Sequence, residues 1–150
     1  MIKIAEISDA KKLTKIALKS KSFWGYTNDI LESWVEDLTV SERIIEEMIV
    51  YKFISDDKII GFYILNQPEL RVVELEFLFV LPVFIGKGIG NQLIQHAFKK
   101  AKDLGCNKIT LLADPNAVTF YGSKGFEIID KKESSIAGRF LPIMQKDLSV

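Results

Sequence analysis

The most informative stretch of this sequence reads Val80-Leu81-Pro82-Val83-Phe84-Ile85-Gly86-Lys87-Gly88-Ile89-Gly90-Asn91. Its apolar beginning ends at Pro82, which cannot continue a sheet ladder, and a glycine-rich turn then leads into a helical pattern. Glycines let a backbone approach a ligand closely, and the first main-chain amides of a helix lack internal acceptors and lie at the positive end of its dipole. The stretch therefore predicts a strand, a turn and a helix that bind an anionic group such as a diphosphate.

The spacing of the glycines argues against the two commonest diphosphate-binding motifs. The dinucleotide motif requires Gly-x-Gly-x-x-Gly, whereas Gly86, Gly88 and Gly90 are each separated by one residue. The nucleoside-triphosphate loop requires Ser or Thr directly after Gly-Lys, where this sequence has Gly88. A nucleotide-binding regulator is therefore the weakest interpretation of this turn.

Strands are predicted on both sides of the turn. Upstream, two runs rich in Ile, Val, Tyr and Phe, at residues 49–54 and 58–65, are separated by Ser55-Asp56-Asp57 and predict a β-hairpin. Residues 71–80 predict the strand that enters the turn, with Glu74 and Glu76 on one face of it. Further strands are predicted at residues 108–113, 126–132 and 139–148.

Helices are predicted where apolar residues recur at helical spacing. The first begins near Ser8, a candidate N-cap, and the second is capped by Thr27 and continues to Leu38. A shorter helix opens at Ser41. The long helix after the glycines ends at Gly105, and a last short helix covers residues 116–123.

Length and composition predict one folded domain, residues 1–150, because 48% hydrophobic and 27% charged residues are close to the globular average. Twenty basic and twenty acidic side chains give a net charge of zero, so no excess positive field attracts nucleic acid. Cys106 cannot form an internal disulfide, the first residues lack the pattern of a signal peptide, and charges interrupt every long apolar run. We therefore expect a cytoplasmic protein with no nucleic-acid and no membrane partner.

Two motifs resemble those of the Gcn5-related N-acetyltransferases (GNAT). In that family the coenzyme A pyrophosphate loop, Q/R-x-x-G-x-G/A, follows a strand ending in V-x-P, and residues 80–82 and 85–90 match it except that Ile85 replaces Gln or Arg. Because the loop acts mainly through backbone amides, this departure is a small one. The second motif, N-x-x-A-x-x-F-Y-x-x-x-G-F, is matched in its second half by Phe120, Tyr121, Gly125 and Phe126. We assign its asparagine to Asn116, which lies four residues before Phe120 where the motif has six.

The resemblance, which covers about residues 58–126, implies a fold, a cosubstrate and a site. The implied fold is α/β, with a mixed, mostly antiparallel sheet flanked by helices and a cleft where two strands splay apart in a V. The cosubstrate is acetyl-coenzyme A, no metal takes part, and Asn116 contacts the pantetheine arm. A main-chain amide near Phe79 or Val80 stabilises the oxyanion. The implied cofactor-binding residues are Leu78, Phe79, Val80, Ile85, Gly86, Lys87, Gly88, Ile89, Gly90, Asn91, Asn116, Phe120 and Tyr121.

The reaction that the resemblance implies needs a base. Only a neutral amine attacks a thioester, whereas an alkylamine with a pKa of about 10.4 is protonated near neutral pH. Glu74 matches the strand position at which some family members hold a glutamate base, and Glu76 is the reserve. Solvated carboxylates without a catalytic role are an equal alternative, with water alone as the base.

The departing thiolate needs an acid, which a phenol can supply because the thiol pKa, judged from cysteine, is about 8.5. In the family the tyrosine hydroxyl faces the departing sulfur, so the resemblance assigns this role to Tyr121. The alternative is a half-buried tyrosine that only packs beside Phe120.

The remaining candidates are interpreted structurally. His96 is expected to be a surface or packing residue, Cys106 a small buried apolar residue and Arg139 a solvated turn arginine.

A module that binds an acyl-coenzyme A without transferring anything is the alternative function. The amine acceptor, whether a small molecule or a peptide, and the formation of a homodimer stay open.

Overall fold

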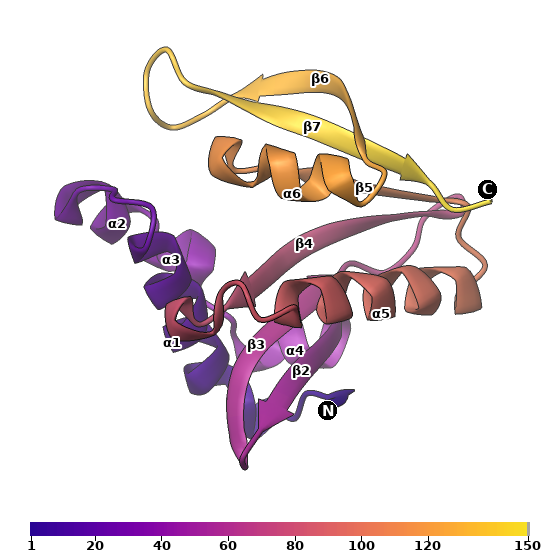
Figure 1. The fold of residues 1–150 in the computed structure, drawn as a ribbon, viewed down its shortest axis with the longest axis horizontal. Helices are drawn as coiled ribbons and strands as arrows, with labels where there is room; N and C mark the ends of the chain where they lie inside the picture. The colour runs from indigo at the N-terminus through magenta and orange to yellow at the C-terminus, as the bar shows by residue number, and fades with distance from the viewer. Residues whose placement is uncertain (150) are drawn as a thin grey trace. The chain divides into compact units, whose positions relative to one another are not determined.

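The computed structural model describes residues 1–149 and contains both helices and strands (Figure 1). The strands form a seven-stranded sheet in the order β1-β2-β3-β4-β5-β7-β6. The pairs β1–β2, β2–β3, β5–β7 and β6–β7 are antiparallel, whereas β4 and β5 run parallel. The expected mixed, mostly antiparallel sheet is confirmed.

The chain forms two compact units. The first unit contains Met1–Leu65 and Phe77–Ala97, and the second contains Asn66–Glu76 and the described residues from Phe98 onward. Strand β4 (Val72–Val80) and helix α5 (Ile89–Asp103) each run from one unit into the other.

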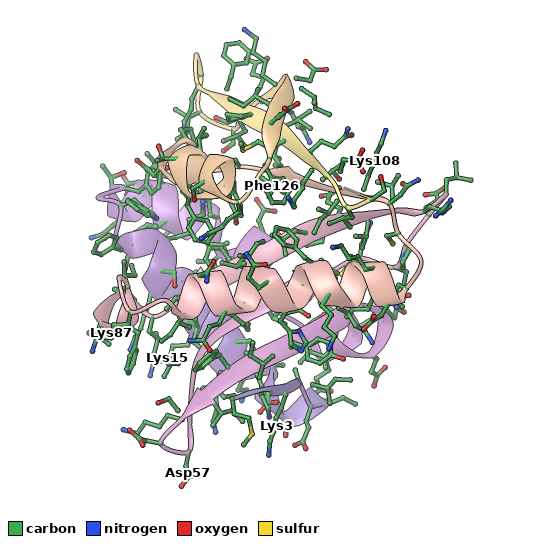
Figure 2. The ribbon with its side chains drawn as sticks, turned by 45° about the vertical axis from the view of Figure 1, so that its right-hand side comes forward. Lys3, Lys15, Asp57, Lys87, Lys108 and Phe126 are labelled. Atoms are coloured by element: carbon green, nitrogen blue, oxygen red, sulfur yellow. The ribbon has the colours of Figure 1, made fainter. Side chains whose placement is uncertain are left out.

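The strands of the first unit include the predicted hairpin. Strands β2 (Ile49–Ser55) and β3 (Lys58–Leu65) pair along their whole length. Asp56 and Asp57 between them have φ values of 50° and 61°, the left-handed backbone that a two-residue hairpin turn requires. Asp57 lies at the tip of this turn (Figure 2). Strand β1 (Ile2–Ile4) pairs with β2 and was not predicted, because three residues are too few to show an alternation.

The N-terminal helices follow their predicted caps in two places out of three. The Ile30 amide donates to Thr27 Oγ1 at 3.4 Å, and the Ile44 amide donates to Ser41 Oγ at 3.1 Å. Ser8, by contrast, is not an N-cap and lies within a short 3-10 helix, η1 (Ile7–Asp9). The elements are η1, α1 (Ala10–Ser22), α2 (Asn28–Ser33), α3 (Val35–Leu38) and α4 (Glu42–Glu47).

Asp9 lies directly before α1 but does not cap it with its side chain, which instead bonds back to Glu6 at the start of η1. Its Oδ2 accepts a hydrogen bond from the Glu6 amide at 2.8 Å and pairs with Lys52 Nζ at 2.6 Å. The start of α1 is therefore tied to strand β2 by a shielded ion pair, a long-range contact that the local sequence could not show.

The helix predicted over residues 27–38 is interrupted at Trp34. The Trp34 amide donates to the Leu31 carbonyl, which is a tighter turn than the α-helical one. The Trp34 ring packs edge-to-face on Tyr26, with 4.8 Å between the ring centroids.

The core of the first unit lies between α1 and the sheet. Buried α1 residues pack with Phe62 and Ile64 of β3, and Phe77 and Phe79 of β4 pack against the same cluster. Phe77 and Phe79 thus share the face of β4 that packs on this core. The α1 members of the cluster are Leu13, Ile16 and Ala17, with Leu18 partly buried beside them.

The second unit is built on β5 and a C-terminal hairpin, in which β7 lies between β5 and β6 (Figure 1). Helix α5 ends as predicted, because Gly105 has a φ of 82° and the Cys106 amide returns to the Ala101 carbonyl at 3.0 Å. Cys106 is buried, as expected. The elements are β5 (Lys108–Leu112), η3 (Pro115–Ala117), α6 (Val118–Ser123), β6 (Glu127–Glu133) and β7 (Phe140–Asp147).

Across residues 1–149, no helix has both the length and the apolar character needed to cross a membrane.

Candidate functional site

The glycine turn lies between the 3-10 helix η2 (Pro82–Phe84) and α5. Gly86 and Gly88 have φ values of 83° and 82°, which side-chain-bearing residues rarely adopt. A Cβ on either glycine would meet nothing within 4 Å, so backbone torsion, and not crowding, requires glycine here. Lys87 between them lies on the turn just before α5 (Figure 2).

The main-chain amides of this turn are available to a ligand. Among residues 1–149, no well-formed hydrogen bond is donated by the amides of residues 86–91, and the first amide of α5 with an acceptor is that of Gln92, to Gly88 at 3.0 Å. The Ile85 amide is already used, because it donates to the Pro82 carbonyl at 3.1 Å. Of the implied cofactor-binding residues 85–91, those from Gly86 onward therefore have amides that can donate to a ligand, and this row of donors is suited to a diphosphate.

The end of β4 is held by other parts of the first unit. Ser20 Oγ donates to the Val80 carbonyl at 2.7 Å, and the Leu81 amide donates to the Ile60 carbonyl at 2.8 Å. A Cβ on Gly61 would lie 2.9 Å from the Phe79 carbonyl oxygen, so glycine is needed at Gly61 for this close approach. Together these contacts hold the backbone at two of the expected cofactor residues, Phe79 and Val80, and Leu78 directly precedes them.

The ladder between β4 and β5 is short. It has four registered pairs, from Val72↔Lys108 to Leu75↔Leu111. Strand β4 nevertheless continues to Val80, so its last residues extend beyond the paired segment. The printed pairing of β4 with β5 therefore ends at Leu75, and the splay expected for this strand stays a prediction.

Glu74 and Glu76 lie in the second unit at that point. The Glu74 amide donates to Asn66 Oδ1 at 2.7 Å, and the Asn66 amide donates to the Glu74 carbonyl at 3.0 Å. The Glu76 side chain reaches solvent, but partial burial, followed by the charge of Glu74 and a hydrogen bond with it, raises the pKa of Glu76 to about 7. The structure thus brings the two candidate bases together.

Tyr121 is buried in an aromatic cluster of the second unit. Its ring packs edge-to-face with Phe120 and Phe126, at centroid distances of 5.2 and 5.6 Å. The Tyr121 hydroxyl has no hydrogen-bond partner within the described chain. Every side-chain polar atom that is fully buried there does have a partner. The Tyr121 hydroxyl is therefore not fully buried and keeps contact with solvent. Burial, and secondly the charge of Asp114, raise the pKa of Tyr121 above its ordinary value of 10.0, which keeps the phenol protonated.

Asn116 belongs to a turn organised by Asp114. Asp114 Oδ1 accepts hydrogen bonds from the Asn116 amide at 2.9 Å and from Asn116 Nδ2 at 3.0 Å. Asp114 Oδ2 lies 3.5 Å from Arg139 Nη2, and the Arg139 side chain is only 19% exposed. The expectation of a solvated turn arginine was wrong, since Arg139 forms a shielded ion pair whose partner no local sequence pattern indicates.

The remaining candidates are structural. His96 Nδ1 and the Tyr63 hydroxyl are 2.7 Å apart, and the Tyr51 ring lies 4.7 Å from the His96 ring, which confirms a packing role. Within residues 1–149, no three His, Cys, Asp or Glu side chains are grouped so that they could hold a metal ion.

Comparison with known sequences identifies relatives of this chain. A family model described as an acetyltransferase (GNAT) domain matches residues 11–148. An uncharacterized N-acetyltransferase of Prochlorococcus marinus, ycf52-like, is 30% identical over 74 residues. That match covers 49% of this chain and 41% of the relative, so less than half of the relative's length is spanned.

Solved structures share the fold. The PaiA N-acetyltransferase of Thermoplasma acidophilum, in complex with coenzyme A, matches over 98% of both chains with a TM-score of 0.83 and 24% identity. The ribosomal-protein-S18-alanine N-acetyltransferase of Escherichia coli matches over 100% of this chain and 94% of its own, with a TM-score of 0.75 and 18% identity. At these identities the likeness concerns the fold alone, and it agrees with the predicted α/β class.

Proposed function

The chain belongs to the GNAT acetyltransferase family, and from this we propose that it is an N-acetyltransferase that moves the acetyl group of acetyl-coenzyme A to an amine. The single observation that supports this most is the glycine turn, whose amides at residues 86–91 are free to donate. We further propose that residues 1–150 act as one transferase domain, since the family model spans both compact units.

The turn would hold the diphosphate of the cosubstrate. Gly86 and Gly88 supply the torsions, and the first amides of α5 supply donors at the positive end of the helix dipole. The complex of the T. acidophilum relative with coenzyme A supports this choice of ligand. Counted back from Phe120, the asparagine position of the family signature is that of Asp114, which is hydrogen-bonded to Asn116, so the turn at residues 114–116 is proposed to contact the pantetheine arm.

Catalysis would be a direct transfer. The neutral amine attacks the thioester carbonyl, and its nitrogen loses a proton to a base, for which Glu76 and Glu74 are the candidates. A pKa of about 7 suits Glu76 to this task, because the carboxylate is then both available near neutral pH and basic enough to take a proton. Glu74 lies beside it and is the alternative base.

The tetrahedral intermediate would then collapse, breaking the carbon–sulfur bond. The electron pair leaves on sulfur, and Tyr121 donates the proton that turns the thiolate into coenzyme A. The raised pKa of Tyr121 keeps the phenol protonated, and it also makes the phenol a weaker acid than an exposed tyrosine. A main-chain amide near Phe79 or Val80, held by the contacts at the end of β4, would stabilise the oxyanion.

The proposal is tested first by binding. A ligand at 100 times its dissociation constant stabilises the native state by about 2.7 kcal/mol, so acetyl-coenzyme A should raise Tm clearly. ATP and NAD are the controls, and stabilisation by them in place of acetyl-coenzyme A would indicate a nucleotide-binding regulator.

Turnover is tested second. Free thiol is measured while a panel of small amines, polyamines and peptides is offered with acetyl-coenzyme A, and thiol release with at least one of them is expected. Binding of acetyl-coenzyme A without thiol release for any acceptor would favour the acyl-coenzyme A sensor.

A further inference from the structure

One peptide group at the end of β4 is held from two sides. The carbonyl of the peptide that joins Val80 to Leu81 accepts a hydrogen bond from Ser20 Oγ at 2.7 Å. The amide of the same peptide donates to the Ile60 carbonyl of β3 at 2.8 Å. Helix α1, strand β3 and the end of β4 supply these contacts, and all three lie in the first compact unit. This peptide therefore cannot turn without breaking one of the two bonds.

Strand β3 approaches this peptide closely. The register of β2 with β3 skips Ile60, which makes this residue a β-bulge, and its carbonyl accepts from the Leu81 amide. The next residue is Gly61, where a Cβ would lie 2.9 Å from the Phe79 carbonyl oxygen. The Phe79 carbonyl and the Leu81 amide are thus both directed toward β3.

Strand geometry then gives the direction of the Val80 amide. In a trans peptide the carbonyl and the amide point in opposite directions, whereas the amide and carbonyl of one strand residue point to the same side. Because the Leu81 amide points toward β3, the carbonyl and the amide of Val80 both point away from β3. Of the two candidate oxyanion donors, the Phe79 amide is directed toward β3, and only the Val80 amide is directed away from it.

Ser20 reaches the Val80 carbonyl from the last part of α1. Ser20 is 6% exposed, and 60 residues separate it from Val80 in the sequence. A serine within a helix can donate to a carbonyl one turn back, as Ser22 Oγ does to the Lys19 carbonyl at 2.6 Å. The Ser20 hydroxyl instead bonds to another element, so it holds the end of β4 and not its own helix.

We propose that Ser20 is a positioning residue, which holds Val80 so that the Val80 amide donates to the thioester carbonyl of acetyl-coenzyme A as this oxygen becomes negative. The inference rests on the proposed function, in which a main-chain amide near Phe79 or Val80 is the oxyanion donor, and it selects Val80. Such a donor is effective when it is already aimed at the place where charge develops, because no reorientation is then needed during the reaction. Ser20 supplies that aim through the carbonyl of the same residue.

The test compares turnover, binding and the bound thioester in Ser20→Ala. Removing an oxyanion donor outright lowers kcat by about 100- to 1,000-fold, so a donor that is only misdirected should lower kcat by about tenfold. The dissociation constant of coenzyme A, which lacks the acetyl group, should change by no more than about twofold in calorimetry.

Infrared spectroscopy supplies a measurement that a purely structural role would not change. Acetyl-coenzyme A is labelled with carbon-13 at the thioester carbonyl, and a hydrogen bond to this carbonyl lowers its stretching frequency. The band should lie lower on the unmodified protein than in buffer. In Ser20→Ala it should return part of the way toward its position in buffer.

Two further variants separate the hydroxyl from its surroundings. Ser20→Cys keeps nearly the same side-chain size but replaces the hydroxyl by a weak donor, so it should show the same loss of kcat as Ser20→Ala. Ser22→Ala is the matched control, because Ser22 is a serine of the same helix whose hydroxyl bonds only to the Lys19 carbonyl on an exposed surface. It should leave both kcat and the infrared band unchanged.

The outcomes distinguish the two proposals. An unchanged kcat or an unchanged infrared band in Ser20→Ala overturns the inference, as does a normal kcat in Ser20→Cys. A loss of coenzyme A affinity as large as the loss of kcat also overturns it, because Ser20 would then support the cofactor site as a whole. Normal binding of coenzyme A shows that a variant is folded. Failure of the unmodified protein to bind acetyl-coenzyme A, or to release thiol with any acceptor, overturns the proposed function instead.

Discussion

The turn at residues 86–91 and the turn at residues 114–116 offer a ligand different kinds of group. The first presents main-chain amides, and its side chains matter only where a glycine torsion is required. The second carries the side chains of Asp114 and Asn116, which are hydrogen-bonded to each other, and its contact with the pantetheine arm is a proposal. A main-chain site should tolerate most substitutions that preserve the backbone, whereas a side-chain site should fail when one partner is changed.

The largest effect is expected from Tyr121→Phe, which changes a side chain and leaves the main chain as it is. The ring would stay packed against Phe120 and Phe126, so only the hydroxyl is lost. Without the proposed acid, kcat should fall by about 100- to 10,000-fold. The dissociation constant of acetyl-coenzyme A should change by no more than about twofold. Thiol release and calorimetry measure the two, and equal losses in both would assign the hydroxyl to binding.

The next largest effect is expected from Gly88→Val, which changes the main-chain turn at residues 86–91. A β-branched residue at a φ of 82° is strained by about 1–2 kcal/mol. The strain should distort the turn and weaken acetyl-coenzyme A binding by about tenfold, with kcat at saturation nearly unchanged.

Gly25→Val is the matched control for this strain. Gly25 has a φ of 80°, and a Cβ there would also meet nothing within 4 Å. Both variants should lower Tm similarly, but only Gly88→Val should lower affinity. A similar loss of affinity in both variants would show that the turn at residues 86–91 has no special role in binding acetyl-coenzyme A.

A smaller effect, on the pH dependence of activity, is expected from Glu74→Gln. Removing the Glu74 charge should lower the pKa of Glu76 from about 7, because that charge is one cause of its rise. If Glu76 is the base, the acidic limb of the kcat/KM profile then moves to lower pH. If Glu74 is the base, activity falls at every pH, and an unchanged profile would leave both carboxylates without a catalytic role.

Stability gives an independent check of the Glu76 pKa. The folded protein holds the Glu76 proton more tightly than the unfolded chain, whose carboxyl has the ordinary value of 4.5. Stability from this group is therefore present below about pH 4.5 and is lost as pH rises through about 7. Glu76→Gln should flatten this slope in thermal unfolding measured between pH 4 and pH 8.

The smallest effect is expected from Ile85→Gln, which restores the residue usual in the family. The Ile85 amide is already bonded to Pro82, and its side chain is 45% exposed. Affinity for acetyl-coenzyme A should change by no more than about twofold. A much larger gain, measured by calorimetry, would show that this turn depends on a side chain after all.

The local features of the chain could be predicted from the sequence. The glycine turn, the hairpin at Asp56-Asp57 and the caps at Thr27 and Ser41 follow from local rules of backbone torsion and hydrogen bonding. The pairing of Glu74 with Glu76 follows from their alternation along one strand.

What could not be predicted depends on contacts between distant parts of the chain. Ser8 does not cap the first helix, and the neighbouring Asp9 pairs with Lys52, which is 43 residues away in the sequence. Arg139 reaches Asp114 because β5 and β7 are neighbours in the sheet, and a single sequence does not give strand order. The break at Trp34 likewise reflects its packing on Tyr26.

The outer strand β6 has a consequence for behaviour in concentrated solution. All its residues, from Glu127 to Glu133, are exposed, and it is the last strand in the order of the sheet. Its sequence carries Asp130, Lys131 and Lys132 in succession, and its pairing with β7 shifts register near Ile129. Charges and a bulge at a sheet edge discourage another chain from adding to it, so this strand protects the protein from aggregating through its own hydrogen-bonding edge.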